Sequence, residues 1–199
     1  MDILDTSFYQ RTDVLRISQE LLGKYLFTTI DGQVTGGKIV ETEAYAHQND
    51  QATQMHLNRR NTRTDVMLQS GGVAYVYTVY RIHRMFNIIT NEEGKPDAVL
   101  VRAIEPTVGL ETMKRRRGIA DLKRLAAGPG MLTKALGVNP DHYGISLTGK
   151  TIWLEDRNDT VAENEIIASP RVGIDYAGED AQLPWRFRIK DNPWVSKAK

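Results

Sequence analysis

Much of this chain consists of short runs in which residues are hydrophobic or alternate between hydrophobic and polar. Tight polar turns separate many of these runs. Two such runs, 24–30 and 34–45, flank the turn Asp31-Gly32-Gln33 and predict a β-hairpin. Further runs predict strands over 71–80, 84–90, 98–106, 151–157, 171–178 and 185–190. Because short consecutive strands joined by tight turns usually pair antiparallel, the pattern favours an antiparallel sheet.

Helices are expected at three places between these runs. Asp13 suits the N-cap of a helix over 14–23, which Gly23 ends. A second helix is expected over 109–118, and a third follows a loop within 125–138, where Gly137 marks its end. Strands and helices do not alternate as strict βαβ units, and the 199 residues contain no repeat or linker. We therefore expect an α+β fold, with one mixed domain over 1–199 and helices flanking the sheet.

The charge balance gives no general attraction to nucleic acid. The chain has 26 Lys and Arg residues against 25 Asp and Glu residues, a net charge of +1. Any contact with nucleic acid must therefore come from local clusters of basic residues. The clusters are Arg59, Arg60 and Arg63, then Arg81 and Arg84, then the run 114–117, and each is also typical of a solvated surface.

The chain has no cysteine, which excludes disulfides and thiolate chemistry. Its 4 histidines do not have the spacing of metal ligands, so we expect no metal and no other cofactor. The N-terminal residues lack the pattern of a signal peptide, and no apolar run has the length of a membrane span. These features predict a cytoplasmic protein that does not contact membranes.

The segment KIVETEAY, 38–45, raises a question because it contains two acids in an apolar run. If the run is a strand, Glu41, Glu43 and Tyr45 share one face, with the two acids roughly 6.5–7 Å apart. Two carboxylates at this distance repel each other, and burial penalises the charged form, which suits general acid–base chemistry. Both acids could equally face solvent on the polar side of the strand, and their spacing also resembles the carboxylate pair of glycoside hydrolases.

Several polar and aromatic residues in the strands also suggest a site. Tyr75 and Tyr77 share one strand face, and Tyr80 lies at the strand end next to Arg81. Rings beside cations suit an unstacked base and its phosphates, although tyrosine is also simply a good strand residue. Asn87 and Arg102 interrupt apolar strands, where a buried polar residue needs a partner, most often a structural one.

Five blocks, in order, resemble the alkyladenine (3-methyladenine) DNA glycosylases of the methylpurine glycosylase type. They are KIVETEAY, AYVYTVYRIHRMFNI, AVLVRAIEP, LAAGPGMLTKALGV, and RVGIDYAG followed by WRFRIKDNPWVS. The resemblance runs from about Leu21 to the end of the chain. It implies a curved antiparallel sheet in one mixed domain. It also implies a hydrolase without a metal that flips alkylated or deaminated purines out of duplex DNA and leaves an abasic site.

The resemblance also implies roles for individual residues. Glu43 matches the general base that activates water, Arg102 an arginine that helps hold this water, and the main-chain carbonyl of Val172 would be the third partner. Glu41 has no counterpart role.

For the base, Tyr45 and Tyr77 match rings that stack on it, and Asn87 matches a residue that disfavours the exocyclic amine of guanine. Tyr80 matches the tyrosine that enters the gap in the duplex. The expected substrates are 3-methyladenine, 7-methylguanine, hypoxanthine and ethenoadenine in double-stranded DNA.

The chain departs from the family pattern at two of these positions. Gln54 replaces a histidine of the base-binding pocket, and His56, two positions on, is a candidate substitute. Arg81 replaces a glycine after Tyr80, which restricts the backbone but offers a phosphate contact, and Arg59 and Arg63 are further expected DNA contacts.

The absence of a long N-terminal extension favours a compact bacterial-type protein, expected to act as a monomer at the nucleoid during repair. Two alternatives stay open. The first is a catalytically weak module of the same fold that binds damaged DNA, and the second is a carbohydrate hydrolase that uses Glu41 and Glu43.

Overall fold

The sheet is organised around strand β3 (Gln33–Tyr45), whose two halves have different neighbours. In the computed structural model, which describes residues 2–58 and 64–197, the first half of β3 pairs with β2 (Tyr25–Ile30). The second half pairs on the same side with β9 (Arg186–Ile189), while β6 (Asp97–Val108) pairs along the other side. Because strands flank both edges of β3 around Glu41 and Glu43, this part of the strand is enclosed within the sheet.

The strand order is β1-β7-β2-β3-β6-β5-β4, with β8 paired to β9, and the strand pairs among the described residues are antiparallel. The remaining strands are β1 (Asp2–Ile3), β4 (Ala74–Val79), β5 (His83–Thr90), β7 (Ile152–Asp156) and β8 (Ile166–Ser169). The helices are α1 (Thr6–Tyr9), α2 (Val14–Glu20), α3 (Gln51–Asn58), α4 (Leu110–Arg117) and α5 (Pro129–Leu136). The expected α+β fold with an antiparallel sheet is confirmed.

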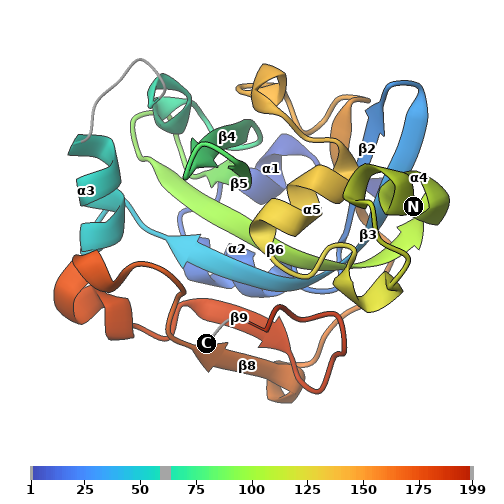
Figure 1. The fold of residues 1–199 in the computed structure, drawn as a ribbon. Helices are drawn as coiled ribbons and strands as arrows, with labels where there is room; N and C mark the ends of the chain where they lie inside the picture. Colours follow the sequence, from blue (N-terminus) through green and yellow to red (C-terminus); the bar gives the residue numbers. More distant parts are fainter. Residues whose placement is uncertain (1, 59–63, 198–199) are drawn as a thin grey trace.

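Helices cover both faces of the sheet: α4 and α5 lie in front of it in Figure 1, and α1 and α2 lie behind it. On the rear face, Thr42 of β3 donates a hydrogen bond of 2.8 Å to the carbonyl of Ser18 in α2. On the front face, Thr133 of α5 donates to the carbonyl of Arg84 in β5 at 3.0 Å. The face of β3 that carries Glu43 is therefore the opposite of the face that packs on α2, as the alternation predicted.

Most of the expected elements form close to their predicted positions. The helix after Asp13 begins at Val14, and the Asp13 side chain accepts a hydrogen bond of 2.9 Å from the amide of Arg16. The helix expected within 125–138 is α5, and it ends at Gly137, whose φ is +78°. The hairpin around Asp31 and Gly32 is also present.

The strand expected over 171–178 is wrong. This segment is a loop that leads into a 3-10 helix, Asp175–Gln182, and Gly173 and Gly178 have φ of +75° and +60°. Such φ values interrupt an extended strand. The hydrophobic residues that suggested a strand, Ile174 and Ala177, instead pack against Ala52 of α3.

Helix α3 was not predicted, because its sequence, QATQMHLN, is mostly polar and buries only Ala52 and Thr53. A signal was present in Asp50, whose carboxylate accepts hydrogen bonds from the Ala52 amide at 3.1 Å and the Thr53 hydroxyl at 2.9 Å. An aspartate that bonds the first turn in this way is typical of a helix start. No helix among residues 2–58 and 64–197 is long and apolar enough to cross a membrane.

The turn between β4 and β5 has an unusual backbone. Tyr80 and Arg81 both have left-handed conformations, with φ of +52° and +63°, and the amide of Ile82 donates to the carbonyl of Val79 at 3.2 Å. The connection has three residues, Tyr80 to Ile82, since Val79 pairs with His83, and glycine or asparagine is usual at positions of positive φ. The conformation costs an ordinary residue about 1–2 kcal/mol, so the turn holds an exposed aromatic residue at an energetic cost.

We expect Arg81→Gly to raise the free energy of unfolding by about 0.5–1 kcal/mol, because glycine adopts positive φ without the steric penalty. Arg84→Gly, at an exposed position of strand β5, is the matched control and is expected to lower it. Urea unfolding measures the free energy of unfolding of both variants relative to the wild type. A lower value for Arg81→Gly would show that Arg81 is not strained in this turn.

Candidate active site

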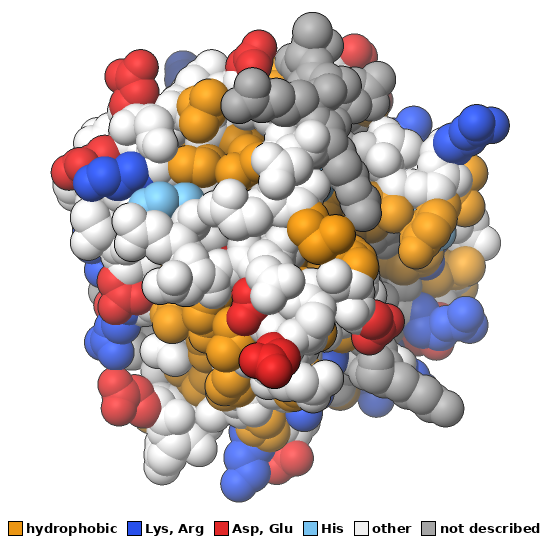
Figure 2. Space-filling model, turned by 90° about the vertical axis from the view of Figure 1, so that its left-hand side faces the viewer, with side chains coloured by type: hydrophobic (Ala, Val, Ile, Leu, Met, Phe, Trp, Pro, Cys, Tyr) orange, Lys and Arg blue, Asp and Glu red, His pale blue; other side chains and the backbone are white. Residues whose placement is uncertain are grey.

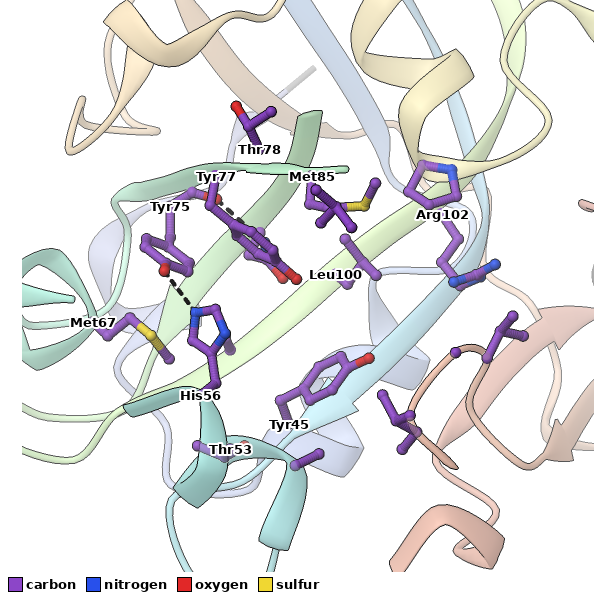
Figure 3. A pocket seen from close by; sticks show the side chains of 18 of the residues that line it. Tyr45, Thr53, His56, Met67, Tyr75, Tyr77, Thr78, Met85, Leu100 and Arg102 are labelled. Atoms are coloured by element: carbon purple, nitrogen blue, oxygen red, sulfur yellow. Dashed lines mark hydrogen bonds between the residues drawn. The ribbon is translucent and has the colours of Figure 1, made fainter. Parts of the chain in front are cut away.

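A cavity of about 670 Å³ opens on the front face of the sheet, at the end of β3 and next to the β4–β5 turn. Figure 3 shows rings and polar side chains from several elements around it: Tyr45 comes from β3, Tyr77 from β4, His56 from α3 and Arg102 from β6. Its volume lies in the range of small-molecule sites and is large enough to admit a purine base. The cavity is therefore the candidate site.

Glu43 lies directly behind the wall of this cavity. Its Oε1 accepts a hydrogen bond of 2.8 Å from the amide of Val172 and lies 3.2 Å from Nη1 of Arg102. Its Oε2 accepts a hydrogen bond of 2.9 Å from the hydroxyl of Tyr45. All three neighbours line the cavity, whereas the Glu43 side chain itself has no exposed surface. The carboxylate is thus one layer from the cavity and oriented by three donors.

Arg102 reaches Glu43 because the pairing of β3 and β6 is irregular at this point. Ile39 pairs with Ile104, Glu41 with Ala103 and Thr42 with Val101, so Val40 and Arg102 each form an extra residue in their strands. An extra residue of this kind redirects its side chain, and such bulges are common beside active sites. The amide of Gly128 donates to the carbonyl of Arg102 at 3.0 Å, which holds the irregular segment in place.

Glu41 is also fully buried, but it faces a different set of partners. Its carboxylate accepts hydrogen bonds from Nε of Arg102 at 3.1 Å and Nε of Arg186 at 2.7 Å. The amide and the hydroxyl of Ser196 also donate to it, at 2.8 and 2.9 Å. Glu41 is absent from the cavity wall. A solvent-facing position for the two acids is therefore wrong, and Glu41 is not placed to act as the second carboxylate of a glycosidase.

The charges of this cluster balance, with Glu41 and Glu43 against Arg102 and Arg186. Burial lowers the pKa of Arg102, but the carboxylates of Glu43 and Glu41 outweigh burial and raise it above its ordinary value. Burial, together with the charge of Glu43, raises the pKa of the Tyr45 hydroxyl well above 10.0. Arg102 therefore stays charged, and Tyr45 stays protonated as a hydrogen-bond donor to Glu43.

The ring of Tyr45 is held from behind by a buried ion pair. The guanidinium of Arg171 lies 4.7 Å from the centre of the Tyr45 ring and 5.0 Å from that of Trp185. Arg171 donates to both carboxylate oxygens of Asp50, at 2.7 and 2.8 Å. The orientation of Tyr45 therefore depends on three other residues, Asp50, Arg171 and Trp185.

Tyr77 and Asn87 line the cavity from neighbouring strands, β4 and β5. Burial raises the pKa of the Tyr77 hydroxyl, which stays protonated at neutral pH. Asn87 is 4% exposed, and its side-chain amide donates to the carbonyl of Tyr75 at 3.3 Å. Tyr80 borders the mouth of the cavity with 85% of its surface exposed.

The structure does not bring Gln54 into the cavity wall. Its side-chain amide donates to the carbonyl of His47 at 2.6 Å, on the outer side of α3. His56, one turn away from Ala52 and Thr53, is the helix residue whose ring lies in the cavity, as Figure 3 shows. The expected DNA contacts Arg59 and Arg63 lie outside the described residues.

The sequence did not reveal Arg171, Asp50, Arg186 and Ser196 as parts of this site. Their contribution depends on contacts between residues that are far apart in the chain, and a local sequence pattern does not predict such contacts. Asp50 alone carried a signal, as a helix-start residue. Among the described residues, no group of three or more His, Asp and Glu side chains could hold a metal ion.

The basic run of α4 makes contacts within the protein. Arg116 donates to the carbonyls of Ile30 and Ala135, and Arg117 donates to that of Leu125. Figure 2 shows that on the face with α3, the coloured Lys and Arg side chains are interspersed with Asp and Glu. The contacts of Arg116 and Arg117 hold two members of the run 114–117 against the protein, so the run is not a wholly free basic surface.

Comparison with known proteins gives a family. A family model described as "Methylpurine-DNA glycosylase (MPG)" matches residues 7–193. A protein of Bacillus mycoides (strain KBAB4), named "Putative 3-methyladenine DNA glycosylase", is 41% identical over 200 residues, which cover 96% of this chain and 98% of that protein. A protein with the same name from Natranaerobius thermophilus is 40% identical over 196 residues, with 97% and 98% covered.

We expect Glu41→Gln to lower the free energy of unfolding by about 3–5 kcal/mol, because it leaves Arg102 and Arg186 buried with one carboxylate fewer. Glu111→Gln is the control, since Glu111 forms an exposed pair with Lys114 and is expected to have little effect. Urea unfolding measures both variants. A loss below about 1 kcal/mol for Glu41→Gln would show that the cluster is not a major source of stability.

Proposed function

The chain belongs to the methylpurine-DNA glycosylase family, whose members are DNA-repair hydrolases, and from this premise we propose how its site releases a base. The protein is a monofunctional DNA glycosylase. We propose that the protein flips alkylated or deaminated purines out of duplex DNA. It then hydrolyses the N-glycosidic bond with a water molecule that Glu43 activates. The substrates proposed are 3-methyladenine, 7-methylguanine, hypoxanthine and ethenoadenine.

One observation carries this proposal: a buried carboxylate with three fixed donors stands behind a cavity that is large enough to admit a purine base and is walled by aromatic rings. Hydrolysis of an N-glycosidic bond develops positive charge on the sugar, which a nearby carboxylate stabilises. A carboxylate held by preorganised donors keeps its position during the reaction. The charge balance of the cluster offsets the cost of burying the Glu43 carboxylate beside that of Glu41.

In the proposed reaction, the oxygen of water forms a bond to C1′ of the flipped nucleotide while the bond from C1′ to the purine nitrogen breaks. The electron pair of that bond leaves with the base, and Glu43 takes a proton from the water. Arg102 and the carbonyl of Val172 would hold the water beside Glu43. Because Tyr45, Arg102 and Val172 cover the carboxylate, the water must approach it past these residues.

The base would lie between the rings of Tyr45 and Tyr77, both on the cavity wall. A cationic base such as 7-methylguanine stacks favourably on tyrosine and leaves without a further proton. Asn87, at 4% exposure, would disfavour undamaged guanine by contact with its exocyclic amine. Discrimination is also expected at the flipping step, since damaged bases are easier to unstack.

Tyr80 would fill the gap that the flipped nucleotide leaves in the duplex. Its exposure of 85% and its left-handed backbone support this, because an exposed aromatic residue in a strained turn contributes little to the fold. Arg81 would add a phosphate contact beside it. Arg59 and Arg63 stay proposals for DNA contact. We further propose that the protein acts as a monomer on DNA at the nucleoid.

We expect Glu43→Gln to lower single-turnover release of hypoxanthine by at least about 100-fold, because the amide cannot accept the proton from water. Binding to the lesion duplex should persist, since Glu43 does not face the base. Fluorescence anisotropy measures binding, and Glu111→Gln is the control for both assays. Near-normal release by Glu43→Gln would overturn the mechanism. Binding without release by the wild type would instead favour the damaged-DNA-binding module.

We expect Tyr80→Ala to weaken binding to a lesion duplex by about tenfold, because base stacking on an aromatic side chain is worth about 1–3 kcal/mol. Release from a lesion in single-stranded DNA, which needs no gap filled, should change much less. Leu68→Ala, at another exposed hydrophobic residue, is the control. Unchanged affinity of Tyr80→Ala for the lesion duplex would refute the role of Tyr80.

A further inference from the structure

We infer that His56 determines whether the enzyme releases neutral purines in addition to cationic purines. This inference rests on the proposed function. It concerns the substrate range of the same cavity and the helix that closes it.

His56 is the residue of α3 that brings a ring into the cavity. Its ring centre lies 5.0 Å from that of Tyr77 and 5.8 Å from that of Tyr75. Among the described residues that line the cavity, His56 is the sole histidine. With Tyr77 it forms a corner of two rings on the side of the cavity that faces Tyr45, as Figure 3 shows.

A hydrogen bond fixes the orientation of this ring. Nε2 of His56 lies 2.7 Å from the hydroxyl of Tyr75, which is itself 3% exposed and packs against Tyr77 and Tyr143. The hydrogen bond therefore joins the helix to the sheet at a partly buried position, where it is stronger than it would be in water. This hydrogen bond thus orients the ring of His56 within the cavity wall.

Neutral and cationic bases depend on this wall to different degrees. A cationic base gains attraction from any tyrosine face and departs as a good leaving group. A neutral base such as hypoxanthine lacks both advantages, so its release depends more on close packing and on polar contacts that hold it in position. Loss of one wall of the cavity should therefore reduce the release of neutral bases more than that of cationic bases.

The test is single-turnover release of hypoxanthine and of 7-methylguanine from matched duplexes by wild type, His56→Ala, His56→Phe and Met55→Ala. Met55 is the matched control, because it lies next to His56 on α3, is 37% exposed and is absent from the cavity wall. Thermal unfolding of each variant establishes that the comparison is made on folded protein.

We expect His56→Ala to lower the ratio of hypoxanthine to 7-methylguanine release by about tenfold or more, and Met55→Ala to leave it unchanged. His56→Phe, which keeps a ring without the hydrogen bond to Tyr75, should restore part of the ratio.

If His56→Ala leaves the ratio of hypoxanthine to 7-methylguanine release unchanged, whether or not it lowers stability, His56 is only a structural residue. This outcome would overturn the inference. Absence of release of both bases by the wild type would instead overturn the proposed function.

Discussion

The buried contacts of Glu41 are the interaction on which the rest of the site depends. One carboxylate joins β3 to Arg102 of β6, to Arg186 of β9 and to Ser196 near the C-terminal end of the described chain. Removing these charges from water costs several kcal/mol for each ion, and the cost is offset only when every partner is in place. The arrangement of the strands and the position of Arg102 are therefore coupled, and Arg102 transmits this coupling to Glu43.

Glu41 and Glu43 share one face of β3, and the residues that surround them give them different environments. Glu41 has two arginines and the Ser196 segment, while Glu43 has one arginine, one amide and the hydroxyl of Tyr45. The irregular pairing that sets Arg102 between them is a property of two strands together. In a charge-balanced cluster of this kind, the two arginines offset the repulsion between the buried carboxylates of Glu41 and Glu43.

The alternation of residues 38–45 was enough to predict the shared face of Glu41, Glu43 and Tyr45, because side chains of a strand alternate regardless of context. The burial of that face could not be predicted, since it requires β9 to pair beside β3 from about 145 residues away. Local pattern also misassigned 171–178, where glycine conformations overrule the hydrophobic spacing. It missed α3, whose polar sequence forms a helix against Ile174 and Ala177.

The groups around the cavity are held in two different ways. Glu43, Tyr77, Asn87 and Arg102 all come from adjacent strands of one sheet, where hydrogen bonds between strands fix their separations. Another part of the wall comes from α3, a helix that meets the sheet through the bond between His56 and Tyr75 and packs on the loop that contains Ile174. Substitutions in α3 can thus reshape the cavity without moving the groups proposed to break the bond, which makes the helix the natural place for changes of substrate range.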